Sequence, residues 1–353
     1  MRVKLRDVAT RANVSVATVS RVLNNYPNVD NATRHQVLQV LNELGYPMME
    51  ARPQSAPADI RTIIVATDGL PDSKQTENEE VHTPANFIHV IINGIELVAR
   101  RSGIRMSILR THMADPSPED LTHFTEGDGV IIIGGVISPA LITALEEAHI
   151  PFVQAAAHAG KHEINCVLGD YLQGATEAIT TLAGLGHHHI AMINGPSTTT
   201  TSIDKLSGYK LGLCEAGLAF DPNLVVPARY FDAQDGYQAT QTLIQCTRNI
   251  TAILYASDSL AIGGIRALSE AGLEVPANVS VVGFYNEPIA QFTIPSLSSI
   301  HVNWQRIGTI AAQRLLTLLE PEQSDEERLR IVLPMHVVLR DSIGPASHHE
   351  NQA

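Results

Sequence analysis

Hydrophobic and polar positions follow two alternating patterns after residue 61 of this chain. Short apolar runs predict β-strands, and segments whose apolar residues recur every three or four positions predict amphipathic helices. The predicted strands are 63–66, 106–109, 130–133, 152–153, 189–194, 224–226, 252–255 and 279–283, with a later one at 331–339. The predicted helices are 87–100, 140–148, 171–184, 204–216, 235–246, 258–271 and 304–319. Strands that alternate with helices indicate parallel sheets with helices on both faces.

The first residues show a different pattern, with two short helical stripes separated by a turn. One stripe runs from Leu5 to Ala12 and the next from Val16 to Leu23. Between them, Asn13 tolerates the left-handed conformation of a tight turn, and Ser15 is a favourable N-cap. A third helix is expected at 30–44, ended by Gly45. The pattern predicts a helix-turn-helix, although a plain helical hairpin has the same spacing.

The outer face of the second helix favours DNA binding over a plain hairpin. Arg21 can pair with guanine O6 and N7 together, and small apolar side chains such as Ala17 can contact a thymine methyl. No carboxylate on this face would repel phosphate. The candidate base contacts are Val16, Ala17, Thr18, Ser20 and Arg21.

Charge is divided unevenly along the chain, which carries a net charge of −13. Residues 1–52 hold +3 and the remainder −16, so positive potential is confined to the region that would contact phosphate. Residues 47–60 are proline-rich and read as a linker. We expect no signal peptide or membrane span, because no sufficiently long apolar run occurs, and three scattered cysteines suit a reducing cytoplasm.

Several motifs together resemble the LacI/GalR family of bacterial transcription regulators. They occur in the family's order and spacing over about residues 3–341. They are VSVATVSRVLN at 14–24, ASDSLAIG at 256–263, VSVVGF at 279–284 and PSLSSI at 295–300. Within the family, the Ser257-Asp258-Ser259 variant of the second motif and the short hinge look most like those of regulators of β-galactoside genes.

The resemblance implies an α/β fold in which an all-α headpiece precedes a two-lobed core like that of periplasmic binding proteins. The expected divisions are a headpiece at 1–46, a hinge at 47–60, a core at 61–341 and a tail at 342–353. Lobe 1 is expected at about 61–166 and 296–322, and lobe 2 at about 167–295 and 328–341. The chain would cross between the lobes near 166–170, 291–296 and 320–328.

The resemblance also implies a palindromic DNA operator, a homodimer or tetramer, and a small-molecule effector between the lobes. The expected DNA contacts are Arg6, Ser15, Val16, Ala17, Thr18, Ser20, Arg21, Asn24, Thr33, Arg34, Met48, Met49 and Arg52. We expect the subunits to meet through the apolar face of 87–98, with Ile88, Ile91, Ile92 and Ile95.

The effector site is where the chain departs from its relatives. Sugar-responsive members typically place an Asp, an Arg, an Asn and an Asp where this chain has Ala156, Lys205, Ser257 and Tyr285. A sugar is the favoured effector, with another small metabolite or no effector as alternatives. The polar candidates are Asp68, Gln154, Asp170, Lys205, Ser257, Asp258 and Asn286. The candidates for stacking on a ring are Phe87, Phe231, Tyr285 and Trp304. For Asp258, a structural role at a helix N-terminus is the alternative.

Other chemistry finds little support in the sequence. Consecutive histidines at 187–189 point in alternate directions and make poor joint metal ligands, so we expect no metal site and no cofactor. No nucleophile elbow, phosphate-binding loop or dinucleotide fingerprint occurs, so an enzyme is not expected. Two function classes remain, a ligand-responsive regulator and a cytoplasmic small-molecule-binding module without specific DNA binding.

Overall fold

The computed structural model divides into two compact units, Met1–Ile60 and Arg61–Ala353. It describes the core at 61–68, 87–111, 123–124, 128–134, 136–247, 249–320 and 327–346. In the first unit it describes 8–9, 11–12, 14–15, 18–19, 33, 35–37 and 39–40. The linker and the side chain of Asp68 lie outside the described residues. So do ten predicted DNA contacts, namely Arg6, Val16, Ala17, Ser20, Arg21, Asn24, Arg34, Met48, Met49 and Arg52.

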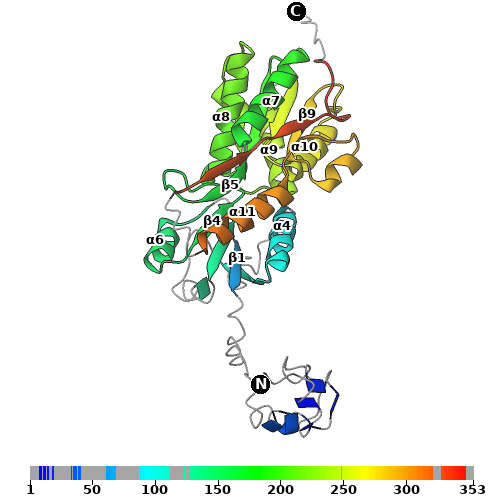
Figure 1. Cartoon of the computed structure of the whole chain (residues 1–353). Coiled ribbons are helices and arrows are strands. Elements are labelled where there is room, and N and C mark those ends of the chain that lie inside the picture. Colours follow the sequence, from blue (N-terminus) through cyan, green and yellow to red (C-terminus); the bar gives the residue numbers. More distant parts are fainter. Residues whose placement is uncertain are drawn as a thin grey trace, which may run out of the picture. The chain divides into compact units, whose positions relative to one another are not determined.

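Lobe 1 is built on a six-stranded parallel sheet in the order β11-β5-β4-β3-β1-β2. The strands are β1 (Thr62–Asp68), β2 (Arg105–Thr111), β3 (Gly129–Ile133), β4 (Phe152–Ala155), β5 (Cys166–Gly169) and β11 (Arg330–Leu333). Helices α4 (Phe87–Arg101) and α11 (Trp304–Leu318) pack side by side against one face (Figure 1). Helix α6 (Pro139–Glu147) covers the other face.

Lobe 2 is built on a second six-stranded sheet in the order β12-β10-β9-β8-β6-β7. Its strands are β6 (Ile190–Asn194), β7 (Val225–Pro227), β8 (Ala252–Tyr255), β9 (Ser280–Tyr285), β10 (Ser298–His301) and β12 (His336–Val338), of which β12 is antiparallel. Helices α7 (Tyr171–Gly184) and α8 (Thr200–Glu215) cover one face, and α9 (Ala233–Cys246) and α10 (Asp258–Glu270) the other. Two 3-10 turns are η1 (Pro222–Leu224) and η2 (Pro288–Phe292).

Every helix predicted within the core is present, with ends that differ by at most a few residues. The alternation that predicted the strands also explains the layers. In β6, Ile190 and Met192 pack beneath α7 and α8, whereas Ala191 and Ile193 pack beneath α9 and α10. Both faces of β6 are buried, so its residues from Ile190 to Ile193 are apolar without alternation.

The expected lobe boundaries require three corrections. Strand β5 belongs to the lobe 1 sheet, and β10 belongs to lobe 2 rather than lobe 1. The strand expected at 331–339 is two strands, of which β11 pairs in lobe 1 and β12 in lobe 2. The chain therefore crosses at Asp170, at 302–303 and at 334–335, not near 291–296 and 320–328. The lobe boundaries are set by pairing between strands that lie far apart in the sequence, and the local hydrophobic pattern does not indicate which strands pair.

The face of α4 expected between subunits is partly used within the lobe. Ile91 and Ile95 are fully buried against the chain's own sheet and α11, while Ile88 and Ile92 are half-buried. Helices α4 and α11 can approach closely because Gly94 has no side chain. A Cβ at this position would lie 2.2 Å from the Gln305 carbonyl oxygen. Only Ile88 and Ile92 of the four expected residues retain surface for a partner.

Candidate functional site

The described residues of the headpiece surround a small apolar core. The backbone N–H of Thr18 donates to the side-chain oxygen of Ser15 at 3.0 Å, and Val19 N–H donates to the Ser15 carbonyl at 3.1 Å. Ser15 is therefore the N-cap of the second helix, as its position in the sequence predicted. The buried side chains are Val8, Ala9, Ala12, Val19, Val37 and Val40. These side chains come from all three expected helices, which pack together through this core.

In the core, three aromatic rings meet where the lobes face each other. Phe87 of α4 stacks on Trp304 of α11, with ring centroids 4.4 Å apart and planes inclined by 21°. Tyr285, which ends β9 in lobe 2, meets Trp304 edge-on at 5.2 Å. Lobe 1 thus supplies two rings and lobe 2 the third, and all three were predicted as stacking residues.

Lys205 of α8 lies beside this cluster and is fully buried. Its Nζ donates to the Ala256 carbonyl at 2.9 Å and to the Tyr285 hydroxyl at 2.7 Å. The centroids of four rings lie within 5.3 Å of Nζ, those of Tyr171, Phe231, Phe284 and Tyr285. We call Lys205 and these four rings the lysine cage.

Burial dominates the electrostatics of the cage. It lowers the pKa of Lys205 well below its ordinary value, although nearby Asp204 and Asp258 act in the opposite direction. Burial likewise raises the pKa of Tyr285 far above its ordinary value, so its hydroxyl stays protonated. Among the described residues, no carboxylate forms an ion pair with Lys205.

Polar contacts join the lobes next to the cage. Asp204 of α8 lies 3.1 Å from His158 Nε2 and 3.8 Å from the Arg330 guanidinium, both contributed by lobe 1. Thr200 also donates from its hydroxyl to the His158 carbonyl at 2.9 Å. His158 Nδ1 accepts from Gly160 N–H, so Nε2 carries the proton donated to Asp204. We call these contacts the Asp204 latch.

The remaining predicted polar residues have partners of their own. Asp170 caps α7, and Ser257 caps α10 while also contacting the Phe231 carbonyl. Asn286 is held by Arg340 and Ser299. These contacts support the local fold, and none of the three side chains is hydrogen-bonded to Lys205.

Two buried side chains near the strand ends keep unpaired polar atoms. Gln154 donates to the Gly134 carbonyl at 3.1 Å, which leaves its amide oxygen without a donor among the described residues. The Trp304 indole N–H has no acceptor there, and that residue is 6% exposed.

Asp258 is buried beneath β9 and β10. Its contacts there favour a structural role for this carboxylate over a role in effector binding. Its carboxylate accepts from the Ser299 hydroxyl at 2.5 Å and from Glu287 N–H at 2.6 Å. A Cβ on Gly283 would lie 2.1 Å from this carboxylate, so glycine is needed where the two strands meet it. Burial, the largest influence, raises the pKa of Asp258 from 3.8 to about 7 despite both hydrogen bonds.

Sequence reasoning missed Tyr171, Phe284 and the Asp204 latch. Alternation along β9 would place Phe284 and Tyr285 on opposite faces, but Tyr285 has a φ of 103° and leaves the strand geometry. Tyr171 directly follows Asp170, which was a predicted site residue, and this adjacency could have identified Tyr171 from the sequence. The latch joins residues separated by 46 and 126 positions, which no local pattern connects.

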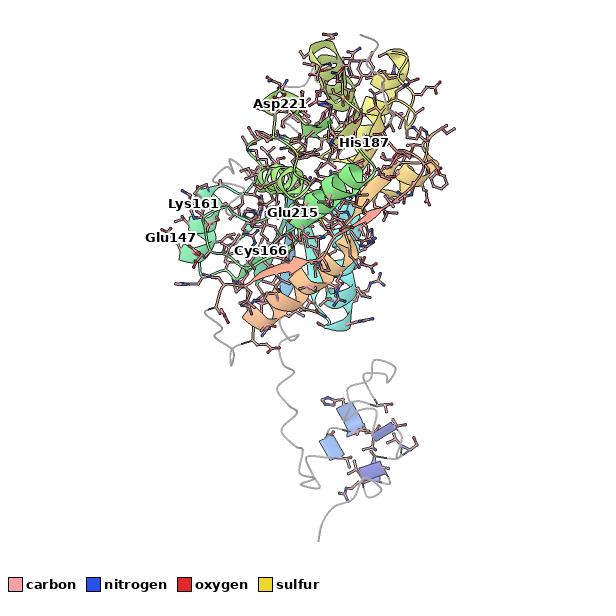
Figure 2. All side chains as sticks on the ribbon, turned by 90° about the horizontal axis from the view of Figure 1, so that it is seen from above. Glu147, Lys161, Cys166, His187, Glu215 and Asp221 are labelled. Carbon is pink, nitrogen blue, oxygen red and sulfur yellow. The ribbon has the colours of Figure 1, made fainter. Side chains whose placement is uncertain are left out.

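The residues considered for metal binding do not gather in the described part of the chain. His187 is buried and its Nε2 lies 3.0 Å from the Gly344 carbonyl, which holds the C-terminal segment against lobe 2. Figure 2 shows His187 and Cys166 in separate parts of the core. No described group of three His, Cys, Asp or Glu residues is arranged to hold a metal, and no described helix is long and apolar enough to cross a membrane.

Two family models match the chain. One describes bacterial regulatory proteins of the lacI family and matches residues 4–47, and the other describes a periplasmic binding protein-like domain and matches 179–343. The transcriptional regulator DegA of Bacillus subtilis (strain 168) is 30% identical over 355 residues, which cover 98% of this chain and 99% of DegA.

Solved structures agree with this assignment over nearly the whole chain. The CelR–cellobiose complex is 26% identical with a TM-score of 0.69, covering 97% of this chain and 100% of that one. The Lac repressor dimer bound to operator and the anti-inducer ONPF is 25% identical with a TM-score of 0.70, covering 98% and 100%. This chain therefore belongs to the LacI family of bacterial regulatory proteins and is a DNA-binding transcription regulator with an effector-binding core, not an enzyme.

Proposed function

We propose that this regulator is a repressor that binds a palindromic operator as a homodimer in the cytoplasm. A sugar bound between the lobes changes its operator affinity. The observation that carries the proposal is the Ser15-capped second helix over a three-helix apolar core, the arrangement that presents a helix to the major groove. Two-fold symmetry of the protein then matches a palindromic site.

The rings between the lobes support a sugar as the effector. The stacked faces of Phe87 and Trp304 offer an apolar surface to the face of a sugar ring. CelR, a relative of the whole chain, was solved with cellobiose. Because the rings come from different lobes, a ligand that contacts all of them binds one arrangement of the lobes better than another and shifts the population toward it.

A gel-shift assay on DNA upstream of the regulator's own gene tests the proposal directly. We expect a specific complex that survives an excess of unrelated DNA and weakens or strengthens when a cognate sugar is added. Binding to all DNA alike would contradict the proposal and favour a small-molecule-binding module.

The base readout predicted for Arg21 provides a sharper test. Arg21→Ala is expected to cost about 1–3 kcal/mol of operator affinity and to relax specificity at one guanine of each half-site. Competition with operators substituted at single positions measures this change. Uniform weakening across all variants would show that Arg21 contacts only phosphate.

The hinge is predicted to act as a flexible tether. It is one residue shorter than the common form, Gln54 stands where the family inserts a leucine, and Pro53 disfavours helical dihedrals at Arg52. Met48→Ala and Met49→Ala should then leave operator affinity nearly unchanged. The alternative is a methionine wedge that kinks the minor groove, and a strong bend lost in these variants would establish it.

A further inference from the structure

Lys205 of the lysine cage has no anionic partner among the described residues, and burial lowers its pKa, which favours the uncharged amine. Lys205 Nζ makes two hydrogen bonds, both to uncharged oxygens. A buried ammonium is stable in proteins when it is paired with an anion, and an unpaired one is costly. Contacts with four ring faces offset part of that cost.

The nearest carboxylates are already engaged with other groups. Asp204 is held by His158 and Arg330 in the latch, and Asp258 by Ser299 and the Glu287 N–H. Neither forms an ion pair with Lys205. The anion missing from the cage is therefore not supplied by the neighbouring residues.

A second donor in the cluster lacks a partner. The Trp304 indole N–H is buried and unpaired, and its ring stacks on Phe87 and contacts Tyr285, which binds Lys205. A buried donor left unpaired is unfavourable, because it has lost its hydrogen bonds to water. The cluster thus combines an unpaired N–H, a buried amine without an anionic partner, and ring faces, and a ligand with negatively charged acceptors would hold that amine in its charged form.

We propose that the interlobe site binds a sugar acid, whose carboxylate replaces the Tyr285 hydroxyl on Lys205 Nζ. This inference rests on the proposed sugar-responsive function and narrows its ligand class. The ligand enters when the lobes part at the three crossings, because Phe87 and Trp304 belong to lobe 1 and Lys205 and Tyr285 to lobe 2. The sugar ring stacks on the aromatic faces, and the indole N–H donates to one of its oxygens.

Matched pairs of compounds test the charge requirement in the full chain. We expect D-galacturonate, D-glucuronate or D-gluconate to raise the thermal unfolding midpoint, and D-galactose and D-glucose at equal concentration to raise it far less. Trp304 is the only tryptophan, so its emission reports directly on the site. The emission should shift with the same acid and show the same concentration dependence.

Lys205→Met separates the charge from the space that the side chain fills. Removing the charge-assisted hydrogen bond should weaken binding of the acid by at least about tenfold. Lys205→Arg, which keeps the charge, should retain part of the affinity. Because a carboxylate raises the lowered pKa of Lys205 again, affinity for the acid should also fall with rising pH in the wild type, and Lys205→Met should lose that dependence.

Three results would overturn the inference. They are equal shifts by the neutral sugars, an acid shift that survives in Lys205→Met, and no shift by any of the acids. Operator binding in the gel-shift assay is a separate measurement. A specific operator complex with no response to acids would reject the sugar-acid site alone, whereas failure of the complex would reject the proposed function.

Discussion

Val19→Asp is expected to abolish specific operator binding while leaving the core intact. Val19 is fully buried in the headpiece, where it packs with a handful of small apolar side chains. An unpaired carboxylate in so small a core costs several kcal/mol, which is comparable to the total stability of such a unit. We expect affinity for the operator to fall to the level of unrelated DNA in a gel-shift titration.

The core provides the internal control for this variant. It forms a separate compact unit with its own apolar clusters, so its thermal transition should be unchanged. Gln36→Asp places the same charge on an exposed position of the headpiece and should preserve its fold. A Val19→Asp protein that still selects its operator would show that the headpiece does not depend on this core.

Asp258→Asn is expected to remove much of the pH dependence of core stability between about pH 4 and 7. Burial raises the pKa of Asp258 from 3.8 to about 7, so folding favours the protonated carboxyl. Its stabilising contribution is therefore fully present below the unfolded value and is lost as pH rises through about 7. At 1.36 kcal/mol per pKa unit, the loss approaches about 4 kcal/mol.

Chemical denaturation of both proteins at several pH values measures this difference. Burial lowers the pKa of His187 and His301, which makes their contribution change in the opposite direction. Comparing the two proteins at each pH cancels those groups and isolates Asp258. Asparagine can accept from Glu287 N–H and donate to Ser299, so the packing is preserved. A variant whose stability follows the wild type at every pH would contradict the prediction.

Segments with a strong local period could be predicted closely from sequence, and those defined by distant partners could not. Helix α7 begins and ends at the predicted residues because Asp170 caps it and its apolar stripe is continuous. Strand β10 was not predicted because it begins with two serines. Both hydroxyls are buried and paired, that of Ser298 with the Arg340 backbone and that of Ser299 with the Asp258 carboxylate. Polar residues in a strand core are intelligible only when their partners are known.

The candidate site shows the same division. The family's motif positions identified Lys205 and Tyr285, and side-chain type marked Phe87 and Trp304 as stacking candidates, and the structure brings these four residues together. The closed ring environment of Lys205 was not predictable, because its four rings come from three distant segments of lobe 2, namely α7, the bend before α9 and β9. The sequence also placed Asn286 among ligand contacts, whereas Arg340 donates to its side-chain oxygen and His301 Nδ1 lies 3.2 Å from its side-chain nitrogen.

The late return of the chain to both sheets has a consequence for biosynthesis. Strand β11 completes the edge of one sheet, and β12, three residues further on, completes the other. On the ribosome, neither lobe has its full set of strands until residues 330–338 emerge, whereas the headpiece is available from the start. A nascent or truncated chain that ends before Arg330 is thus a folded headpiece attached to two incomplete sheets. Such a product exposes the edges of β5 and β10, and unpaired strand edges promote aggregation.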